Sequence, residues 1–307
     1  MKYRTVFHTV LFLFFVTVLS AQTTQEGFAH VDGADLYYKI IGSGDPVVIL
    51  HGGPGLEHTY LLPQFAHLAK HYKLIFYDQR ASGKSTGVVD SATMTVTQFV
   101  DDLEGFRKAL KLKKMNLLGH SWGGLLAMKY AITYPQQMTS LILANSIGVN
   151  AEWLLPYIQT RTARTTHEDS LAIARITASK EFARKEPKAV EEFARTLFRT
   201  YFYHRSSADS LSLSFSQQTA ANLLDIFGIF LKQFQQYDIR TPLSALTCPT
   251  LVIHGDYDVV LPHYAEEIHK SIKGSEFVVL KNCGHFPFIE APVQFFEECK
   301  RFLKRGQ

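Results

Sequence analysis

Residues 115–131 read Met-Asn-Leu-Leu-Gly-His-Ser-Trp-Gly-Gly-Leu-Leu-Ala-Met-Lys-Tyr-Ala, and they carry the strongest indication of the fold. Its first four residues are typical of a short buried strand, and its last seven have the apolar spacing of a helix. Strand, Gly-x-Ser-x-Gly and helix, in that order, form the context that a nucleophile elbow requires. Gly119 and Gly123 permit the sharp turn, because a Cβ at either position would collide with a neighbouring element. The pattern predicts Ser121 as a nucleophile raised above a sheet.

A serine nucleophile needs a base to take its proton and an acid to orient that base. Two further apolar runs, 250–255 and 276–280, are predicted strands, and each leads into a loop with titratable residues. Asp256 and Asp258 follow the first run, and His285 follows the second. Open α/β sheets place their chemistry just beyond the carboxyl ends of strands. The order serine, aspartate, histidine is that of the α/β-hydrolase arrangement, so His285 is the predicted base.

The choice of acid lies between Asp256 and Asp258. A carboxylate next to the glycine that ends a strand often braces the turn, which is the structural interpretation of Asp256. We favour Asp258, which precedes the apolar entry into the next helix. Of the thirteen histidines, His254 is interpreted as a core residue of a strand and His51 as a residue that fixes a loop. His58, His67 and His71 are expected on the surface or in helix packing.

A glycine-rich loop follows the predicted strand at 46–50 and reads His51-Gly52-Gly53-Pro54-Gly55. Such a loop can present bare backbone N–H groups. The N–H groups of Gly53 and of Trp122, which begins the helix after the serine, are predicted to form an oxyanion hole. The alternative is a turn without a catalytic role.

The pattern of apolar runs that predicts buried strands stops after about residue 148 and returns at 250. Between these points, three segments with helical spacing are predicted at Leu171–Ala183, Lys188–Tyr203 and Ala220–Tyr237. The chain is therefore predicted to be an α/β protein of the α/β-hydrolase fold, with a mostly parallel sheet, helices on both faces and an inserted helical cap. The predicted divisions are a leader at 1–21, core at 22–148, cap at 149–240 and core again at 241–307.

Aromatic side chains of the cap are expected to form its core, and a few to line an apolar pocket above Ser121. Such a pocket suits a small hydrophobic acyl group or a prolyl ring. Glu191, Glu192 and Asp225 are the acids that could contact a substrate amine. The alternative for each is a solvated helix face.

Three motifs resemble those of the proline iminopeptidase (prolyl aminopeptidase) family of serine peptidases. They are His51–Gly55, then Tyr77-Asp78-Gln79-Arg80 with Ser82, Gly83 and Ser85, then Gly119-His120-Ser121-Trp122-Gly123-Gly124. The resemblance implies a triad of Ser121, Asp258 and His285, and release of an N-terminal proline or another small apolar residue through an acyl-enzyme. The resemblance implies a reaction that needs no cofactor and no metal.

The chain departs from this family in two places. His120 stands where many members carry glycine. Family members also hold the substrate amine with cap glutamates, one of them commonly beside a tryptophan, and no Trp-Glu pair occurs in this cap. An esterase, amidase or lactonase for small hydrophobic acyl groups is therefore the alternative activity, and a non-catalytic small-molecule binder is the alternative of another class.

The first 21 residues have the pattern of a secretory signal peptide. Lys2 and Arg4 precede an apolar run around 10–16, and Leu19-Ser20-Ala21 supplies small residues before a polar stretch. The run is shorter than the ~20 residues of a spanning helix, so cleavage is favoured over a membrane anchor. The protein is expected to be secreted or periplasmic.

Composition narrows the partners to a small-molecule or short-peptide substrate. The 307 residues carry a formal net charge of +4, of which Lys2 and Arg4 contribute two, and nothing indicates binding to nucleic acid. Cys248, Cys283 and Cys299 are too few for a disulfide framework, and a Cys248–Cys299 bridge is not favoured. Neither a metal-ligand cluster nor a dinucleotide-binding motif is visible, and the oligomeric state is left open.

Overall fold

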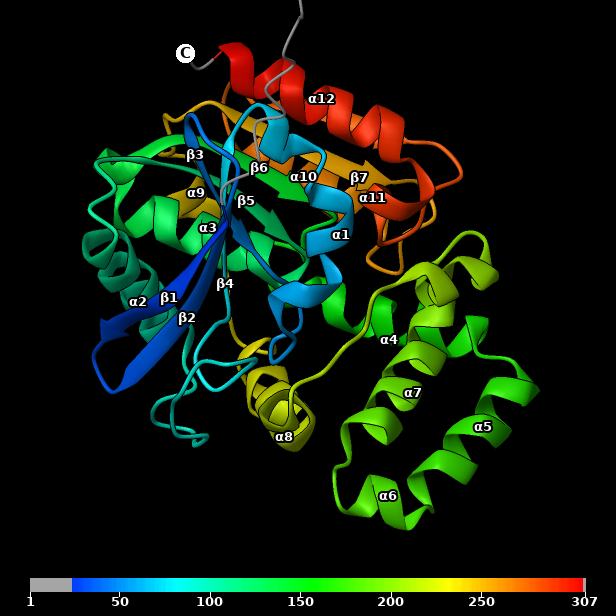
Figure 1. Cartoon of the computed structure of the whole chain (residues 1–307). Coiled ribbons are helices and arrows are strands. Elements are labelled where there is room, and N and C mark those ends of the chain that lie inside the picture. Colours follow the sequence, from blue (N-terminus) through cyan, green and yellow to red (C-terminus); the bar gives the residue numbers. More distant parts are fainter. Residues whose placement is uncertain (1–23, 306–307) are drawn as a thin grey trace, which may run out of the picture.

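The computed structural model describes residues 24–305 and is built on one eight-stranded sheet (Figure 1). The predicted leader at 1–21 lies outside the described residues. The order across the sheet is β1-β2-β4-β3-β5-β6-β7-β8. The strands are β1 (Thr24–Val31), β2 (Ala34–Ile41), β3 (Pro46–Leu50), β4 (Lys73–Tyr77), β5 (Met115–His120), β6 (Met138–Ala144), β7 (Thr250–Gly255) and β8 (Glu276–Leu280).

Five neighbouring strand pairs, from β4–β3 across to β7–β8, are parallel, whereas β1–β2 and β2–β4 are antiparallel. The central strands are buried on both faces. Parallel strands covered on both sides read as continuous apolar runs, which is why 46–50 and 250–255 could be recognised without alternation. Parallel strands also end at one edge of the sheet, so β3, β5 and β7 deliver their following loops to the same place.

The helices cover both faces of the sheet (Figure 1). Helices α2, α3 and α10 contact its strands, and α1, α11 and α12 pack together elsewhere on the core, where Phe65 contacts Phe288, Phe295 and Phe296. The α-helices of the core are α1 (Leu62–Phe65), α2 (Val96–Ala109), α3 (Trp122–Thr133), α10 (Pro262–Ser271), α11 (Pro287–Glu290) and α12 (Pro292–Arg305). Its 3-10 helices are η1 (His58–Tyr60), η2 (Leu68–Lys70) and η3 (Pro135–Gln137).

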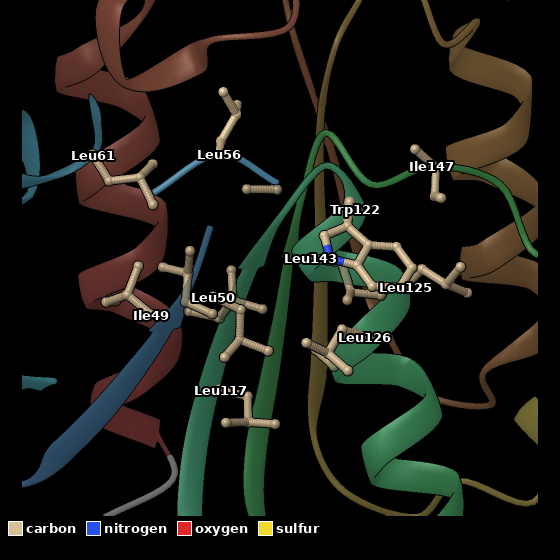
Figure 2. Close-up of a cluster of buried hydrophobic side chains, with 14 of the residues drawn as sticks. Ile49, Leu50, Leu56, Leu61, Leu117, Trp122, Leu125, Leu126, Leu143 and Ile147 are labelled. Atoms are coloured by element: carbon tan, nitrogen blue, oxygen red, sulfur yellow. The ribbon is translucent and has the colours of Figure 1, made fainter. Parts of the chain in front are cut away.

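The core is densest where α3 meets the sheet. Trp122, Leu125 and Leu126 of α3 lie in the same apolar cluster as Leu117 of β5 and Leu143 of β6 (Figure 2), and all are buried. Burying such side chains contributes roughly 1.5–3 kcal/mol each. The packing therefore holds the start of α3, where the elbow lies, in one position on the sheet.

The cap lies between β6 and β7 in the sequence. Its helices are η4 (Ala151–Trp153), α4 (Leu154–Arg164), α5 (His167–Thr177), α6 (Lys180–Ala183), α7 (Pro187–Phe198), η5 (Arg199–Tyr201), η6 (Arg205–Ser210), α8 (Gln217–Gln233) and α9 (Arg240–Leu243). Helices α5, α6 and α7 form a lobe that projects away from the sheet, whereas α8 lies against the core (Figure 1). The predicted fold class, including the inserted cap, is confirmed.

Helix α8 is tied to the core loop that follows β4. The Gly83 N–H donates to Thr219 Oγ1 at 2.7 Å, and the Asn222 side chain donates to the Ala81 carbonyl at 2.9 Å. The two ends of the cap also meet, because the Ile239 N–H donates to the Val149 carbonyl at 2.9 Å and Asn150 forms a β-bridge with Asp238.

The predicted helical segment Leu171–Ala183 is two helices. Helix α5 starts earlier, at a capping box in which Thr166 Oγ1 accepts from the Asp169 N–H and the Asp169 carboxylate accepts from the Thr166 N–H. It ends at Thr177, and Ser179 then caps α6 by accepting from the Phe182 N–H. A serine that satisfies the free N–H groups of a new helix favours a break in the chain, and the apolar spacing alone did not reveal it.

All three cysteines are free thiols. None of the helices in residues 24–305 combines the length and the apolar character needed to cross a membrane.

Candidate active site

Ser121 occupies the turn between β5 and α3 with φ 57° and ψ −121°. A positive φ is costly for a residue with a Cβ, and such strain persists where the surroundings enforce it. The close packing around the turn holds it, and only glycine fits on either side: a Cβ on Gly119 would lie 2.2 Å from the Gly123 carbonyl oxygen, and one on Gly123 would lie 2.3 Å from the Leu50 carbonyl oxygen. Both glycines are therefore required for the predicted reason, which is that a Cβ would collide with a neighbouring element.

The structure brings His285 and Asp258 together beside this turn. His285 Nδ1 lies 2.9 Å from each carboxylate oxygen of Asp258. An ionised carboxylate only accepts hydrogen bonds, so Nδ1 carries the proton. In neutral His285 the free lone pair is therefore on Nε2. His285 and Ser121 line the same cavity, and a base with its lone pair on Nε2 can take the hydroxyl proton.

Asp258 is fully buried, and its surroundings hold it ionised. Burial alone would raise its pKa, but the nearby imidazoles of His285 and His254 and the hydrogen bonds from His285 and Asn145 lower the pKa to about 2. Asn145 Nδ2 donates to Asp258 Oδ2 at 2.7 Å and to the Gly284 carbonyl at 2.9 Å. Asn145 was missed by sequence reasoning. The only signal was its place directly after the apolar run of β6.

Asp256 does not contact the imidazole of His285. Its carboxylate accepts from the Cys283 N–H at 3.3 Å and lies 3.7 Å from the Lys281 amino group. These contacts brace the turn between β7 and the His285 loop, which is the structural role considered for it. His254 is buried in β7, where Nε2 donates to the Val260 carbonyl at 2.7 Å, as expected for a core residue.

The two predicted oxyanion donors face no competing acceptor. Trp122 is the first residue of α3, and the first N–H groups of a helix have no partner inside it. The hydrogen bonds of the described loops include none from the Gly53 N–H. The Gly52 N–H, by contrast, donates to Tyr60 Oη at 2.7 Å. Of the two adjacent glycines, Gly53 is thus the one with a free donor beside the cavity.

Gln79 joins the two loops that carry these donors. Its Nε2 donates to the His51 carbonyl at 2.9 Å, its backbone N–H donates to His51 Nε2 at 3.1 Å, and its Oε1 accepts from Trp122 Nε1 at 2.8 Å. His51 Nδ1 donates to the Gly52 carbonyl. Burial lowers the pKa of His51 to about 4, so it stays neutral and fixes the loop, as expected from sequence.

The residues on either side of Gln79 are structural. Arg80 forms a buried bidentate pair with Asp102 and donates to the Asp32 carbonyl. Asp78 accepts from the Lys84 N–H and from both the backbone N–H and Nδ1 of His58. The expectation of a surface or helix-packing role for His58 was therefore wrong. Its buried partner lies 20 residues further along the chain, which no local pattern could reveal.

His120, the residue before the nucleophile, is buried in a chain of hydrogen bonds. Tyr60 Oη donates to His120 Nδ1 at 2.7 Å, and His120 Nε2 donates to the His285 carbonyl at 2.8 Å. Burial and the neighbouring His285 lower the pKa of His120 to about 3. Neutral His120 therefore connects the glycine-rich loop, through Tyr60, to the backbone of His285.

A cavity of about 970 Å³, counted to its open mouth, lies over Ser121 and His285. Its walls are largely apolar and come from both core and cap, including Trp153, Phe193, Phe198, Phe227 and Phe234. The cap is also bonded to the base, because the His285 N–H donates to the Tyr201 carbonyl at 2.8 Å.

The acids proposed as amine contacts do not line this cavity. Glu192 pairs with Arg175 at 2.6 Å and Asp225 with Lys185 at 2.8 Å. Glu191 accepts from the Phe215 N–H at 2.8 Å and pairs with Lys188. Each acid faces a cation or a backbone amide outside the cavity. Glu192 and Asp225 thus have the solvated positions that were the alternative for them, whereas Glu191 is buried. No aspartate or glutamate occurs among the described residues of its lining, and no cluster in residues 24–305 is arranged to hold a metal ion.

Comparison with known proteins places the chain in a family. Residues 45–292 match the model of the alpha/beta hydrolase fold. A proline iminopeptidase of Saccharolobus solfataricus is 30% identical over 91% of this chain and 92% of the relative, and one of Heyndrickxia coagulans is 30% identical over 91% and 98%. A crystal structure of a Mycobacterium smegmatis proline iminopeptidase superposes with a TM-score of 0.69 at 22% identity, covering 92% of this chain and 98% of that one. The chain belongs to the α/β-hydrolase family and is a hydrolase, and its predicted resemblance to proline iminopeptidases is confirmed.

Proposed function

We propose that this hydrolase cleaves an ester or amide bond of an apolar acyl group through an acyl-enzyme on Ser121. The observation that carries the proposal is His285 Nδ1, which lies between the two oxygens of a buried, ionised Asp258 while Nε2 is free. A carboxylate in this position holds the imidazole in the tautomer that can accept a proton.

The proposed reaction has two halves. Ser121 Oγ attacks the carbonyl carbon, His285 Nε2 takes the hydroxyl proton, and the Gly53 and Trp122 N–H groups stabilise the negative oxygen. The tetrahedral intermediate then expels the leaving alcohol or amine, which receives the proton from His285. In the second half, His285 removes a proton from water, the hydroxide attacks the acyl carbon, and the acid product leaves as Ser121 regains its proton.

The relatives' names support an aminopeptidase activity, with substrates that carry an N-terminal proline or another small apolar residue. The apolar walls suit a prolyl ring. Such a substrate carries an ammonium group, however, and an unpaired charge in an apolar cavity is expensive. The described lining contains no carboxylate to pair with it. Backbone carbonyls and hydroxyls would have to hold the amine.

An esterase, amidase or lactonase for acyl groups without a free amine is the second candidate, and the lining favours it. Aromatic and aliphatic side chains would desolvate an uncharged acyl group without leaving a charge unpaired. Of the two substrate classes, the geometry supports this one better.

Two variants test the chemistry. Ser121→Ala and His285→Ala should each lower kcat for 4-nitrophenyl butyrate by roughly 10⁶, and the double variant should lose little more, because the residues act as a unit. The wild-type protein should be labelled covalently by a fluorophosphonate, whereas Ser121→Ala should not. Ordinary turnover by Ser121→Ala would contradict the assignment of Ser121 as the nucleophile. A wild-type protein that is not labelled would favour a non-catalytic binder.

Three substrates test the acyl group: proline β-naphthylamide, its N-acetylated form and 4-nitrophenyl butyrate. Equal or better turnover of the blocked amide and the ester would support the second candidate. A strong preference for the free amine would establish the aminopeptidase and require that backbone groups hold the ammonium.

We also propose that residues 1–21 direct export and are then removed. The charged start, short apolar run and small residues before position 22 support this. Mass spectrometry of the protein from its native host should find an N-terminus near residue 22, and an intact Met1 in the mature protein would contradict the proposal.

A further inference from the structure

Among the described residues that line the cavity, Arg161 is the one with a charged side chain besides the histidines. It belongs to the last turn of α4, which lies between the core and the projecting lobe of the cap (Figure 1). The guanidinium carbon of Arg161 is 5.9 Å from the ring centroid of Tyr157, which also lines the cavity. Tyr157 in turn hydrogen-bonds Tyr201, whose ring lies 5.3 Å from that of His285.

Arg161 differs from the arginines around it in having neither a hydrogen-bond nor an ion-pair partner for its guanidinium among the described residues. Arg164, one turn further along α4, donates to the Tyr257 and Thr200 carbonyls. Arg175 pairs with Glu192, and both Arg199 and Arg205 pair with Asp169. Within residues 24–305, no hydrogen bond or ion pair involves the Arg161 guanidinium.

A half-buried guanidinium among apolar walls favours an anion. The group is always charged, and its planar fork of N–H donors matches the two oxygens of a carboxylate. The same positive charge disfavours a substrate ammonium nearby. A single guanidinium balances one negative charge, so a carboxylate fits better than a doubly charged phosphate ester.

We propose that Arg161 is a specificity-determining residue that binds a carboxylate of the substrate while Ser121 attacks the ester or amide carbonyl. The inference rests on the proposed function and adds the substrate class: monoanionic acyl compounds whose carboxylate is separate from the scissile bond. That carboxylate can belong to the acyl group or to the leaving group, and the two arms of the experiment distinguish these sources.

The acyl arm compares mono(4-nitrophenyl) adipate with its terminal carboxamide. The leaving-group arm compares 4-carboxyphenyl butyrate with 4-carbamoylphenyl butyrate. The members of each pair are matched in size and differ in the charge at the far end, and the rate with Ser121→Ala corrects for their intrinsic reactivity. The proteins are the wild type, Arg161→Met, Arg161→Lys and the control Arg175→Met, which removes one cap charge outside the cavity. Ser121→Ala supplies the rate that does not depend on the nucleophile.

In one arm, wild type should prefer the carboxylate substrate in kcat/KM. Arg161→Met should lower kcat/KM for it by roughly 10- to 100-fold, the worth of a hydrogen bond to a charged group. The loss should fall mainly on KM. Arg161→Lys should restore part of it, and Arg175→Met should match wild type. The carboxamide should be turned over equally by all four proteins.

Equal use of the carboxylate and carboxamide substrates by wild type, in both arms, would overturn the inference. So would a loss in Arg161→Met of the same size for both members of a pair, since that is a structural effect. Either result leaves the proposed function standing, because Ser121-dependent turnover of the carboxamides measures it separately.

Discussion

The indole Nε1 of Trp122 donates a 2.8 Å hydrogen bond to the side-chain oxygen of Gln79. The same Gln79 amide donates to the carbonyl of His51, at the head of the glycine-rich loop. One buried side chain thus sets the spacing between the two loops that carry the proposed oxyanion donors. Those donors are useful only at hydrogen-bond distance from the developing negative charge.

Gln79→Met should therefore lower kcat more than it raises KM. We expect a loss of roughly 10-fold or more in kcat, below the roughly 100- to 1,000-fold cost of deleting an oxyanion donor. The free energy of unfolding should fall by about 1–3 kcal/mol, since the indole N–H and the His51 carbonyl lose a buried partner. Ester kinetics and urea unfolding measure both effects. A variant with unchanged kcat would remove Gln79 from the positioning of the donors.

Asp258→Asn should lower kcat by roughly 10⁴ while the protein remains folded, because an amide in place of the carboxylate favours the wrong tautomer of His285. Asp256→Asn is the matched control, since within residues 24–305 the contacts of its carboxylate are with Lys281 and the Cys283 N–H. It should change kcat by less than about 10-fold. Circular dichroism checks folding in both variants. If Asp256→Asn is the more damaged of the two, their roles are reversed.

Glu192→Gln and Asp225→Asn should leave kcat/KM for both free-amine and blocked substrates within about twofold of wild type. Each acid forms an exposed ion pair outside the cavity, and such pairs are worth about 0–1 kcal/mol. A selective loss with the free amine in either variant would return that acid to the substrate site and would require a rearranged cap.

The folded protein should lose stability as the pH falls from about 6.5 toward 4. Burial lowers the pKa of His120 to about 3, whereas an unfolded histidine titrates near 6.5. Between these values the unfolded chain binds more protons, so the free energy of unfolding rises with pH, by at most about 1.4 kcal/mol per pH unit for one group.

Urea unfolding between pH 4 and 7 measures this slope. His120→Gln should flatten it, although His51, with its pKa lowered to about 4, leaves a residual slope of the same sign. Asp258 is no confounder in this range. Its lowered pKa of about 2 stabilises the fold above the unfolded value of about 3.9 and loses effect only below it. Identical slopes in wild type and variant would contradict the assignment of a buried neutral His120.

The fold could be predicted because its deciding signals are local. The strand, turn and helix around Ser121 are contiguous, and Asp258 and His285 each follow a strand that reads as one apolar run. The parts that could not be predicted depend on partners distant in the chain. Asn145 reaches Asp258 from 113 residues away and Gln79 reaches Trp122 from 43, and neither lies in a pattern that names its partner.

The positions of side chains in the cap could not be predicted from the sequence either. Glu191, Glu192 and Asp225 were selected by residue type, but the side on which an acid lies depends on how its helix packs. Arg161 was not selected at all, because an arginine near the end of a helix is normally solvated, and only the cavity distinguishes it from its neighbours.

The meeting of the two cap ends, where Ile239 bonds Val149 and Asn150 bridges Asp238, has an evolutionary consequence. The whole insertion leaves and re-enters the core at one point, so a gene segment encoding another helical cap could be exchanged there without altering the spacing of the core strands. Ser121, Asp258 and His285 all lie outside that segment. Evolution of the cap could therefore change the substrate that the protein binds while the catalytic residues of the core stay the same.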